Sequence, residues 1–513
     1  MRPLAILLGL FVSLLPAQWS PTTGQWGKAD PLDVRVMTWN VKDTLCSTAV
    51  KQSGANAWTA LARIIATLKP DVLVLQECAD NNGNTTGTTM DSVANLTAAL
   101  NLFLHGGTDT FTSGNPAVTA YVQLYAPGYD LPHIFVSTSH DNYNRNVILS
   151  RWPYADLNGD TVSQLSNTPT VTAHLYAGGG TGGIRGFMFA EIDLPQANYA
   201  GDLVVGNAHL KAGGTASDHT QRVNAARNVA YYVDHLYNGA GLGTPDPFGK
   251  IADSPAATMV LGANTPVVMG GDWNEDEVTN NDVGPAQWLT AAQNLDGAGT
   301  SDGTDRNRTD MILDLAADEF TLSTITGFGS KYDYMVWQDS VATLRNSFVF
   351  NVATIPTGLA PATLTGWSGA LNTMSTTASD HRPVIVDLIL PRPLPCNTAA
   401  IDLGMAKLGG NMLFPRFSAC GSTAVGAPVT LSLTSAAPNA IIYVGLGTSS
   451  AYLPLAGGTI LPAPLSVGGP FFTDATGSFT LPIANPAGSL IAQWAIIDPG
   501  ATFSLAFSNG LSF

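Results

Sequence analysis

Six short polar motifs follow apolar, strand-like stretches of this chain, and each brings an acid, an amide or an imidazole to a predicted strand end. In chain order they are TWN at 38–40, LQE at 75–77, NAHL at 207–210, GGDWN at 270–274, YDY at 332–334 and SDHRPV at 379–384. Strand ends at one edge of a sheet are where a packed scaffold can gather polar groups around a metal ion and a phosphate. The motifs therefore predict chemistry on a phosphate ester.

The residue types suit the separate tasks of that reaction. Splitting a phosphoester requires neutralised charge on the phosphoryl oxygens, an activated water molecule and a stabilised leaving oxygen. Mg²⁺ takes oxygen ligands and uses one or two carboxylates, so Glu77 is the best single metal ligand. Asp272 and Asn274 lie two apart on an extended segment and point to the same face, where Asp272 suits a general base and Asn274 a donor to the phosphate. Asp380 and His381 are consecutive, so a turn must present both.

Each motif alone is weak, but their joint order and spacing are hard to obtain by chance. At these motifs residues 33–390 resemble the endonuclease/exonuclease/phosphatase family, which is related to deoxyribonuclease I, while the loops between the motifs are unmatched. The resemblance implies an α/β fold, a two-sheet α/β sandwich with outer helices, and a Mg²⁺ cofactor, with Mn²⁺ or Ca²⁺ as alternatives.

The resemblance also implies roles for individual residues. Asn40 would hold either the Glu77 carboxylate or the cation, and Asp380 would lie close to the cation. His381 would face the phosphate and be oriented by Asp333. His209 would hydrogen-bond to the phosphate or protonate the leaving oxygen.

Several positions depart from the family pattern or remain open. Lys42 follows Asn40 by two, where some members carry an acid that contributes to the metal site, which argues against a second metal. Trp273 replaces a more frequent Phe and should face the core. Arg145 could face substrate or could be a solvated strand end. The acidic run 275–277 is expected to be a solvated turn rather than a cation site, and the DLNGD stretch at 156–160 lacks the later Glu of a Ca²⁺ loop.

The elements that must position these residues follow from hydrophobic periodicity. Residues 33–41 and 71–77 are predicted strands around a helix at 56–69, which gives a β-α-β opening. Residues 81–120, rich in Asn, Thr and Gly, are expected to be a long insertion, and residues 217–236 a helix capped by Ser217.

The composition changes sharply after a proline-rich linker at 391–395. Residues 396–513 contain five charged side chains, Asp402, Lys407, Arg416, Asp474 and Asp498. Alternating apolar runs separated by Gly, Pro, Asn and Ser predict a small all-β sandwich. With no cluster of acids or histidines it is expected to be an accessory domain, with attachment or carbohydrate binding as the alternative. The catalytic domain is accordingly placed at 31–390.

Features of the whole chain point to export. Residues 1–17 have a positive start, an apolar run too short to span a bilayer comfortably, and small Ala17, which predicts a cleaved signal peptide rather than a retained anchor. A secreted or extracytoplasmic protein with no transmembrane anchor after cleavage is therefore expected. Pairing of Cys46 with Cys78 and of Cys396 with Cys420 fits this location, although free buried thiols are an alternative.

The predicted function is that of a secreted, divalent-metal-dependent phosphodiesterase, and a monomeric nuclease acting on DNA or RNA is the first hypothesis. The net charge of −16 would repel nucleic acid at long range. It mildly favours a small or neutral head group, as in the second hypothesis, in which a phospholipid of the sphingomyelin type or an inositol phosphate is the substrate. Bound cations and a few local basic residues could still offset the charge in a nuclease, and no amphipathic hairpin or aromatic-rich loop that would enter a membrane supports a lipid substrate. A third possibility is a non-catalytic surface or adhesion protein. The complete polar set at the strand ends argues against it.

Overall fold

The computed structural model describes most of both predicted domains. The described residues are 24, 26–45, 51–78, 92–140, 144–166, 187–237, 256–259, 261–262, 264–277, 284–289, 330–338, 341–393, 396, 399–407, 409–411, 413–422, 424–456, 458–486 and 489–513. The predicted signal peptide at 1–17 and Cys46 lie outside them, as do residues 394 and 395 of the predicted linker.

The first sheet has six strands and carries the predicted β-α-β opening. Its order is β12-β13-β1-β2-β6-β5. The strands are β1 (Val34–Asn40), β2 (Val72–Gln76), β5 (His133–Val136), β6 (Val147–Ser150), β12 (Thr343–Val349) and β13 (Val384–Ile389). β1 and β2 are parallel and are joined by α1 (Ala57–Leu68), whose N-cap Asn56 accepts a hydrogen bond from the Thr59 backbone. Their carboxyl ends, which carry the first two motifs, therefore meet at one edge.

The second sheet has five strands in the order β11-β10-β9-β8-β7. They are β7 (Gln164–Leu165), β8 (Phe187–Ile192), β9 (Leu203–His209), β10 (Val267–Asp272) and β11 (Asp333–Trp337). β9 and β10 are parallel, with Asp272 paired to His209, and β11 runs antiparallel to β10, with Asp333 paired to Asp272. Three motif residues thus lie side by side at one end of this sheet.

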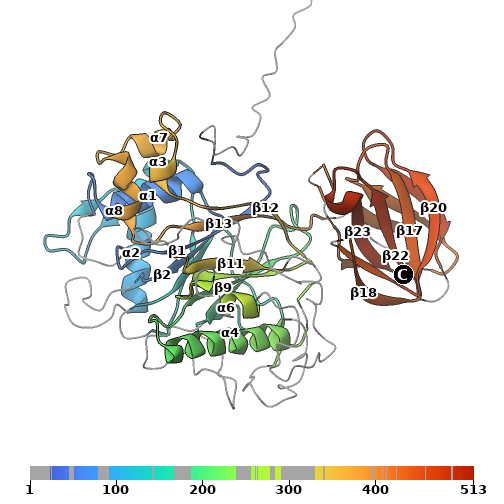
Figure 1. Ribbon diagram of the computed structural model, residues 1–513, viewed down its shortest axis with the longest axis horizontal. Coiled ribbons are helices and arrows are strands. Elements are labelled where there is room, and N and C mark those ends of the chain that lie inside the picture. Colours follow the sequence, from blue (N-terminus) through green and yellow to red (C-terminus); the bar gives the residue numbers. More distant parts are fainter. Residues whose placement is uncertain are drawn as a thin grey trace, which may run out of the picture.

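The two sheets pack face to face and helices cover their outer sides, so the predicted two-sheet α/β sandwich is confirmed (Figure 1). Val36 and Val74 of the first sheet share one core with Val204 and Met335 of the second. Five helices lie on the side of the first sheet: α1, α2 (Val93–His105), α3 (Tyr121–Tyr125), α7 (Ala362–Thr365) and α8 (Met374–Ala378). The second sheet carries α4 (Ala216–Leu236) and α6 (Pro285–Leu289).

Within the predicted insertion at 81–120, the described residues from 92 onward include α2, which buries Leu96, Leu100 and Phe103 on one helix face. One local prediction needs correction. The cap of α4 is Thr215 rather than Ser217. The Thr215 hydroxyl accepts from the Asp218 backbone, and the Asp218 carboxylate accepts from the Thr215 backbone, so a complete capping box begins the helix earlier.

A buried polar seam joins the two sheets beneath the edge that carries the motifs. The Asn207 amide on β9 donates to the carbonyl oxygens of Leu75 and Val147 in the first sheet, at 2.9 Å each. The Gln76 amide donates to Asn207 Oδ1 at 2.8 Å and to Thr38 Oγ1 at 3.0 Å. Because buried hydrogen bonds are directional, the seam fixes how the two sheets align.

An ion pair is buried within the first sheet, on strands β1 and β13. Arg35 donates to both carboxylate oxygens of Asp387, at 2.6 and 2.8 Å, and both side chains are 0% exposed. Arg35 Nη1 also donates to the carbonyl oxygens of Trp26 and Leu68. The Arg35 guanidinium therefore finds partners for most of its N–H groups without water.

Glu191, on β8, is a buried ionisable side chain with no basic partner among its described contacts. Its carboxylate accepts from the Leu157 backbone. Burial, reinforced by the nearby carboxylates of Asp160 and Asp156, raises the Glu191 pKa to about 8, although the Leu157 bond opposes this shift. Glu191 is therefore mostly protonated in the folded protein at neutral pH.

Glu191 should make the protein less stable as the pH rises. Its pKa is higher in the folded state (about 8) than in an unfolded chain (4.5), so its stabilising effect is complete below pH 4.5 and is lost as the pH approaches 8. We expect Glu191→Gln to raise the free energy of unfolding at pH 8.5 by a few kcal/mol, with little effect at pH 4.5. Urea unfolding at both pH values measures this, and equal effects at the two would contradict it.

The regular elements among the described residues between 401 and 512 are strands, apart from one 3-10 turn at Thr502–Ser504, in agreement with the predicted all-β structure. One sheet has the order β14-β23-β22-β17-β20, a second β15-β16-β21, and β18 pairs with β19. The strands are β14 (Ile401–Gly404), β15 (Arg416–Gly421), β16 (Pro428–Thr434), β17 (Ile441–Gly447), β18 (Ser449–Leu455), β19 (Gly458–Ala463), β20 (Ser466–Phe472), β21 (Phe479–Ala484), β22 (Ile491–Ile497) and β23 (Leu505–Ser512). Trp494 is fully buried, with its ring edge-on to those of Phe417, Phe471 and Phe479. The first two sheets therefore share a core, as in a sandwich.

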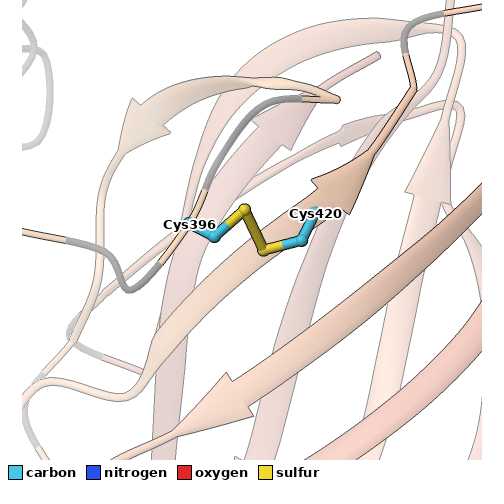
Figure 2. Close-up of a disulfide and its surroundings, with 2 residues drawn as sticks. All are labelled: Cys396 and Cys420. Carbon is cyan, nitrogen blue, oxygen red and sulfur yellow. A yellow bond between two sulfur atoms is a disulfide. The ribbon is translucent and has the colours of Figure 1, made fainter.

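One of the two predicted disulfides is present. Cys396 and Cys420 are bonded, with Cα atoms 5.5 Å apart, and fasten the segment before β14 to β15 (Figure 2). Cys78 is instead a free, buried thiol, so the predicted pairing with Cys46 is not seen. Among the described helices, none is both long and apolar enough to cross a membrane.

Candidate active site

The residues singled out from the sequence meet at one edge of the sandwich, and both sheets contribute. The first sheet brings Asn40 at the end of β1, Glu77 directly after β2, and Asp380 and His381 before β13. The second sheet brings His209 and Asp272 at the ends of β9 and β10, Asn274 just beyond, and Asp333 at the start of β11. The site therefore spans the junction between the two sheets.

Asp272 is the centre of this arrangement. The side chain is almost completely buried, and its Oδ2 atom accepts a hydrogen bond from the Asn40 amide at 3.0 Å. The same oxygen lies 3.5 Å from His209 Nε2 and 3.6 Å from His381 Nε2. Oδ1 accepts from the Asn274 backbone at 3.0 Å. One carboxylate thus faces two imidazoles and is held by groups from both sheets.

His381 forms a dyad with Asp333. His381 Nδ1 lies 2.8 Å from Asp333 Oδ2. Burial lowers the His381 pKa, but attraction to Asp333 and Asp272 outweighs it and raises the pKa to about 10. His381 is therefore an imidazolium at neutral pH, with Nδ1–H directed at Asp333 and Nε2–H toward Asp272.

The turn that presents Asp380 and His381 is made by Ser379. The Ser379 hydroxyl donates to the Asn40 carbonyl oxygen at 2.7 Å and accepts from the His381 backbone at 3.0 Å. Trp39 Nε1 donates to the His381 carbonyl oxygen at 3.0 Å. These contacts attach the turn before β13 to the end of β1. None of these three contacts was anticipated from the sequence, although Ser379 and Trp39 belong to the motifs.

Glu77 and His209 complete the site from adjoining sheets. Their closest atoms, Glu77 Oε1 and His209 Nε2, are 3.7 Å apart, and the Glu77 side chain is 25% exposed. Glu77 has a φ of 52° and Asn274 a φ of 55°, a left-handed backbone that is uncommon outside glycine. Non-glycine residues in this conformation cluster at functional sites. Here they occur where the chain turns sharply after β2 and β10.

Asn40 and Asp380 have partners that the resemblance did not imply. The Asn40 amide nitrogen binds Asp272 rather than Glu77, and its oxygen accepts from the Lys42 backbone at 3.0 Å. Asp380 Oδ2 forms an ion pair with Lys42 Nζ at 2.8 Å. Lys42 therefore borders the set of groups expected to hold a cation.

One group of described side chains brings its ligand atoms close enough to hold a cation: those of Asp272, Asp333 and His381 lie within 4.8 Å of one another. The ligands predicted from the sequence, Asn40, Glu77 and Asp380, carry oxygen donors, which a hard cation such as Mg²⁺ prefers.

The acidic run 275–277 is not the solvated turn expected from the sequence. All three residues are buried. Glu275 accepts from Arg222 Nε of α4 at 2.6 Å, and Arg222 Nη1 donates to the carbonyl oxygens of Lys211 and Gly213. Glu277 accepts from the Ala286 backbone. The run therefore anchors the loops that follow His209 and Asp272, because α4 supplies a basic partner from a distant part of the chain.

Other candidates from the sequence have structural roles. Arg145 is not a solvated strand end, since it is buried and donates to the carbonyl oxygens of Ser137 and Thr138. The Asp156 carboxylate accepts from the Gly159 and Thr161 backbones within a turn. Trp273 faces the core as expected, stacked on Tyr334 with ring centroids 5.3 Å apart.

Comparison with known proteins finds structural likeness only. No protein-family model matches the sequence, and no curated protein matches it. Among solved structures, the human Nocturnin catalytic domain is 13% identical with a TM-score of 0.36, covering 70% of this chain and 93% of that one. An endonuclease/exonuclease/phosphatase family protein from Bacteroides thetaiotaomicron is 12% identical with a TM-score of 0.36, covering 70% and 98%. Sphingomyelinase C from Streptomyces griseocarneus is 13% identical with a TM-score of 0.32, covering 69% and 99%. Such identities and TM-scores are too low to carry a function to this chain.

Proposed function

We propose that this chain is a divalent-cation-dependent phosphoric ester hydrolase of the endonuclease/exonuclease/phosphatase type, and that its substrate is a phosphodiester. The observation that carries the proposal is the buried Asp272 carboxylate, which lies between two imidazoles and is held by Asn40. A buried carboxylate beside a protonated histidine pairs a proton acceptor with a positive donor, as attack of water on a phosphorus atom requires.

In the proposed reaction Asp272 is the general base. It accepts a proton from the attacking water, while Asn40 and the Asn274 backbone hold its two oxygens in place. The His381 imidazolium, oriented by Asp333, donates to a phosphoryl oxygen where negative charge develops. His209 lies on the other side of Asp272 and is placed to hydrogen-bond to the phosphate or to protonate the leaving oxygen.

Asn274 and the cation-binding group support these steps. The Asn274 amide donates one N–H to the Leu210 carbonyl oxygen at 3.1 Å, which leaves its second N–H for a phosphate oxygen. Glu77, Asp380 and the Asn40 oxygen would hold the cation, with Mg²⁺ expected first. When bound, the cation supplies positive charge opposite the phosphoryl oxygens.

Nucleic acid is the first substrate we propose, and a phospholipid of the sphingomyelin type or an inositol phosphate is the second. The net charge of −16 favours the second, because it opposes long-range approach of a polyanion. We further propose that the protein is secreted. The signal-like residues 1–17 and the Cys396–Cys420 disulfide support this location.

The test is hydrolysis of plasmid DNA, RNA, sphingomyelin and bis(p-nitrophenyl) phosphate by protein lacking residues 1–17, each with Mg²⁺ and with EDTA. We expect EDTA-sensitive cleavage of at least one of them. DNA or RNA cleavage would support the first substrate, whereas lipid cleavage without nucleic acid would support the second. Asp272→Asn protein purified in parallel controls for contaminating enzymes. Equal turnover by both proteins, or none on any substrate, would refute the proposal.

A further inference from the structure

Lys42 is an exposed cation at the edge of the acidic cluster. It lies two residues beyond Asn40, where the backbone has a φ of 46°. The Lys42 side chain is 58% exposed and the Asp380 side chain 43%, and their charged atoms are 2.8 Å apart. The contact crosses from the end of β1 to the turn before β13, so it belongs to the same edge as Asp272 and His381.

Several carboxylates attract this ammonium. The Lys42 ammonium lies 2.8 Å from Asp380 Oδ2, and Glu77 and Asp43 are further carboxylates that attract it. A lysine side chain carries a full positive charge at neutral pH. Its charge lies beside Glu77 and Asp380, which are two of the three groups proposed to hold the cation.

We infer that Lys42 is the second positive charge of this active site, contacting a phosphate oxygen of the substrate and limiting the site to one divalent cation. This inference rests on the proposed function and assigns part of the charge neutralisation to a side chain. An ammonium has three N–H donors, and Asp380 Oδ2 engages one of them. Because the side chain is exposed, the others are accessible to an approaching phosphate.

The limit to one cation follows from charge and occupancy. A second divalent ion near Asp380 would have to displace the ammonium from Oδ2 or lie close to it. Two cations a few ångströms apart repel each other, and the repulsion grows where protein rather than water surrounds them. The Lys42 side chain thus supplies the positive charge that a second bound cation would otherwise supply.

Lys42→Gln is the test variant, and Lys69→Gln is its matched control. Lys69 also has left-handed backbone, with a φ of 49°, and is exposed, but it precedes β2, at the end away from Glu77. Both variants therefore lose one charge from the same backbone conformation. Lys42→Arg keeps the charge and serves as the rescue.

Three quantities are measured on the full chain lacking residues 1–17. The dissociation constant of inorganic phosphate with Mg²⁺ present should rise about tenfold in Lys42→Gln, the effect of one charge-assisted hydrogen bond, and should stay unchanged in Lys69→Gln. The kcat/KM should fall by about 10-fold to 100-fold in Lys42→Gln and recover largely in Lys42→Arg. Calorimetric titration with Mn²⁺ should show one more bound ion in the unaltered protein than in Glu77→Gln.

The outcomes separate this inference from the proposed function. Metal-dependent turnover that Lys42→Gln leaves unchanged would overturn the inference and leave the function standing. A difference of two Mn²⁺ ions between the unaltered protein and Glu77→Gln would also overturn it. If no ester is hydrolysed, the proposed function fails, and the phosphate and Mn²⁺ titrations still decide whether Lys42 binds phosphate beside a single cation.

Discussion

Asp272→Asn should lower kcat by about 10²-fold to 10⁴-fold, because the amide cannot accept the proton of the attacking water. The amide has the size of the carboxylate and still offers an oxygen to the Asn40 amide, so the fold should change little. Steady-state kinetics with a substrate that the hydrolysis test shows to be cleaved measures the effect. Unfolding curves for both proteins serve as the control, since a large loss of stability in Asp272→Asn would mean that unfolding, and not the missing base, lowers kcat.

His381→Ala should be impaired to a similar degree, because it removes the positive donor that Asp333 orients. The double variant should be little slower than the worse single one, since residues that act as a unit do not contribute additively. Full activity in purified His381→Ala protein would overturn the assigned roles. If the double variant instead loses the product of the two single losses in kcat, Asp272 and His381 act in separate steps.

Arg35→Ala should lower the free energy of unfolding by about 3–5 kcal/mol, the usual cost of leaving one member of a buried ion pair without its partner. Asp387 would keep a carboxylate that is 0% exposed, with Asn346 as its remaining side-chain donor at 3.2 Å. Urea unfolding of the chain lacking residues 1–17 measures the change, with the transition of the two-sheet domain followed separately from that of the C-terminal sheets.

The matched control replaces both partners. Arg35→Met combined with Asp387→Leu should recover most of the lost stability, because apolar side chains of similar volume often replace a buried pair without penalty. If the double variant is as unstable as Arg35→Ala, the hydrogen bonds from Arg35 to Trp26 and Leu68 matter more than the ion pair. Unchanged stability in Arg35→Ala would contradict the prediction outright.

The sheets were predictable because buried strands such as 33–41 and 71–77 are continuous apolar runs that end in polar residues. The meeting of the motifs followed from this, since parallel strands bring their carboxyl ends to one edge. The partners of individual polar groups were not predictable. The run 275–277 reads as a surface turn until α4 places Arg222 against Glu275, and the local sequence contains no sign of that contact.

Asn40 is a residue of the site whose partner could not be predicted from the sequence. Its position could be predicted, but its amide binds Asp272 across the junction of the sheets rather than the neighbouring Glu77. The choice depends on how far apart the sheets lie, which the side chains of the whole core decide together. Spacing along one chain segment carries no information about that distance.

The polar seam beneath the site has a mechanical consequence. A purely apolar interface between two sheets resists separation but allows slight sliding, whereas the bonds from Asn207 to Leu75 and Val147 lengthen with any sliding. Asp272 lies on one side of that interface, and Asn40 and His381 lie on the other, so shear between the sheets would change the distances from the base to these two residues. The seam therefore keeps the two sheets in a fixed relative position. The loops around the site can then differ in sequence without changing the geometry of Asp272 and its partners.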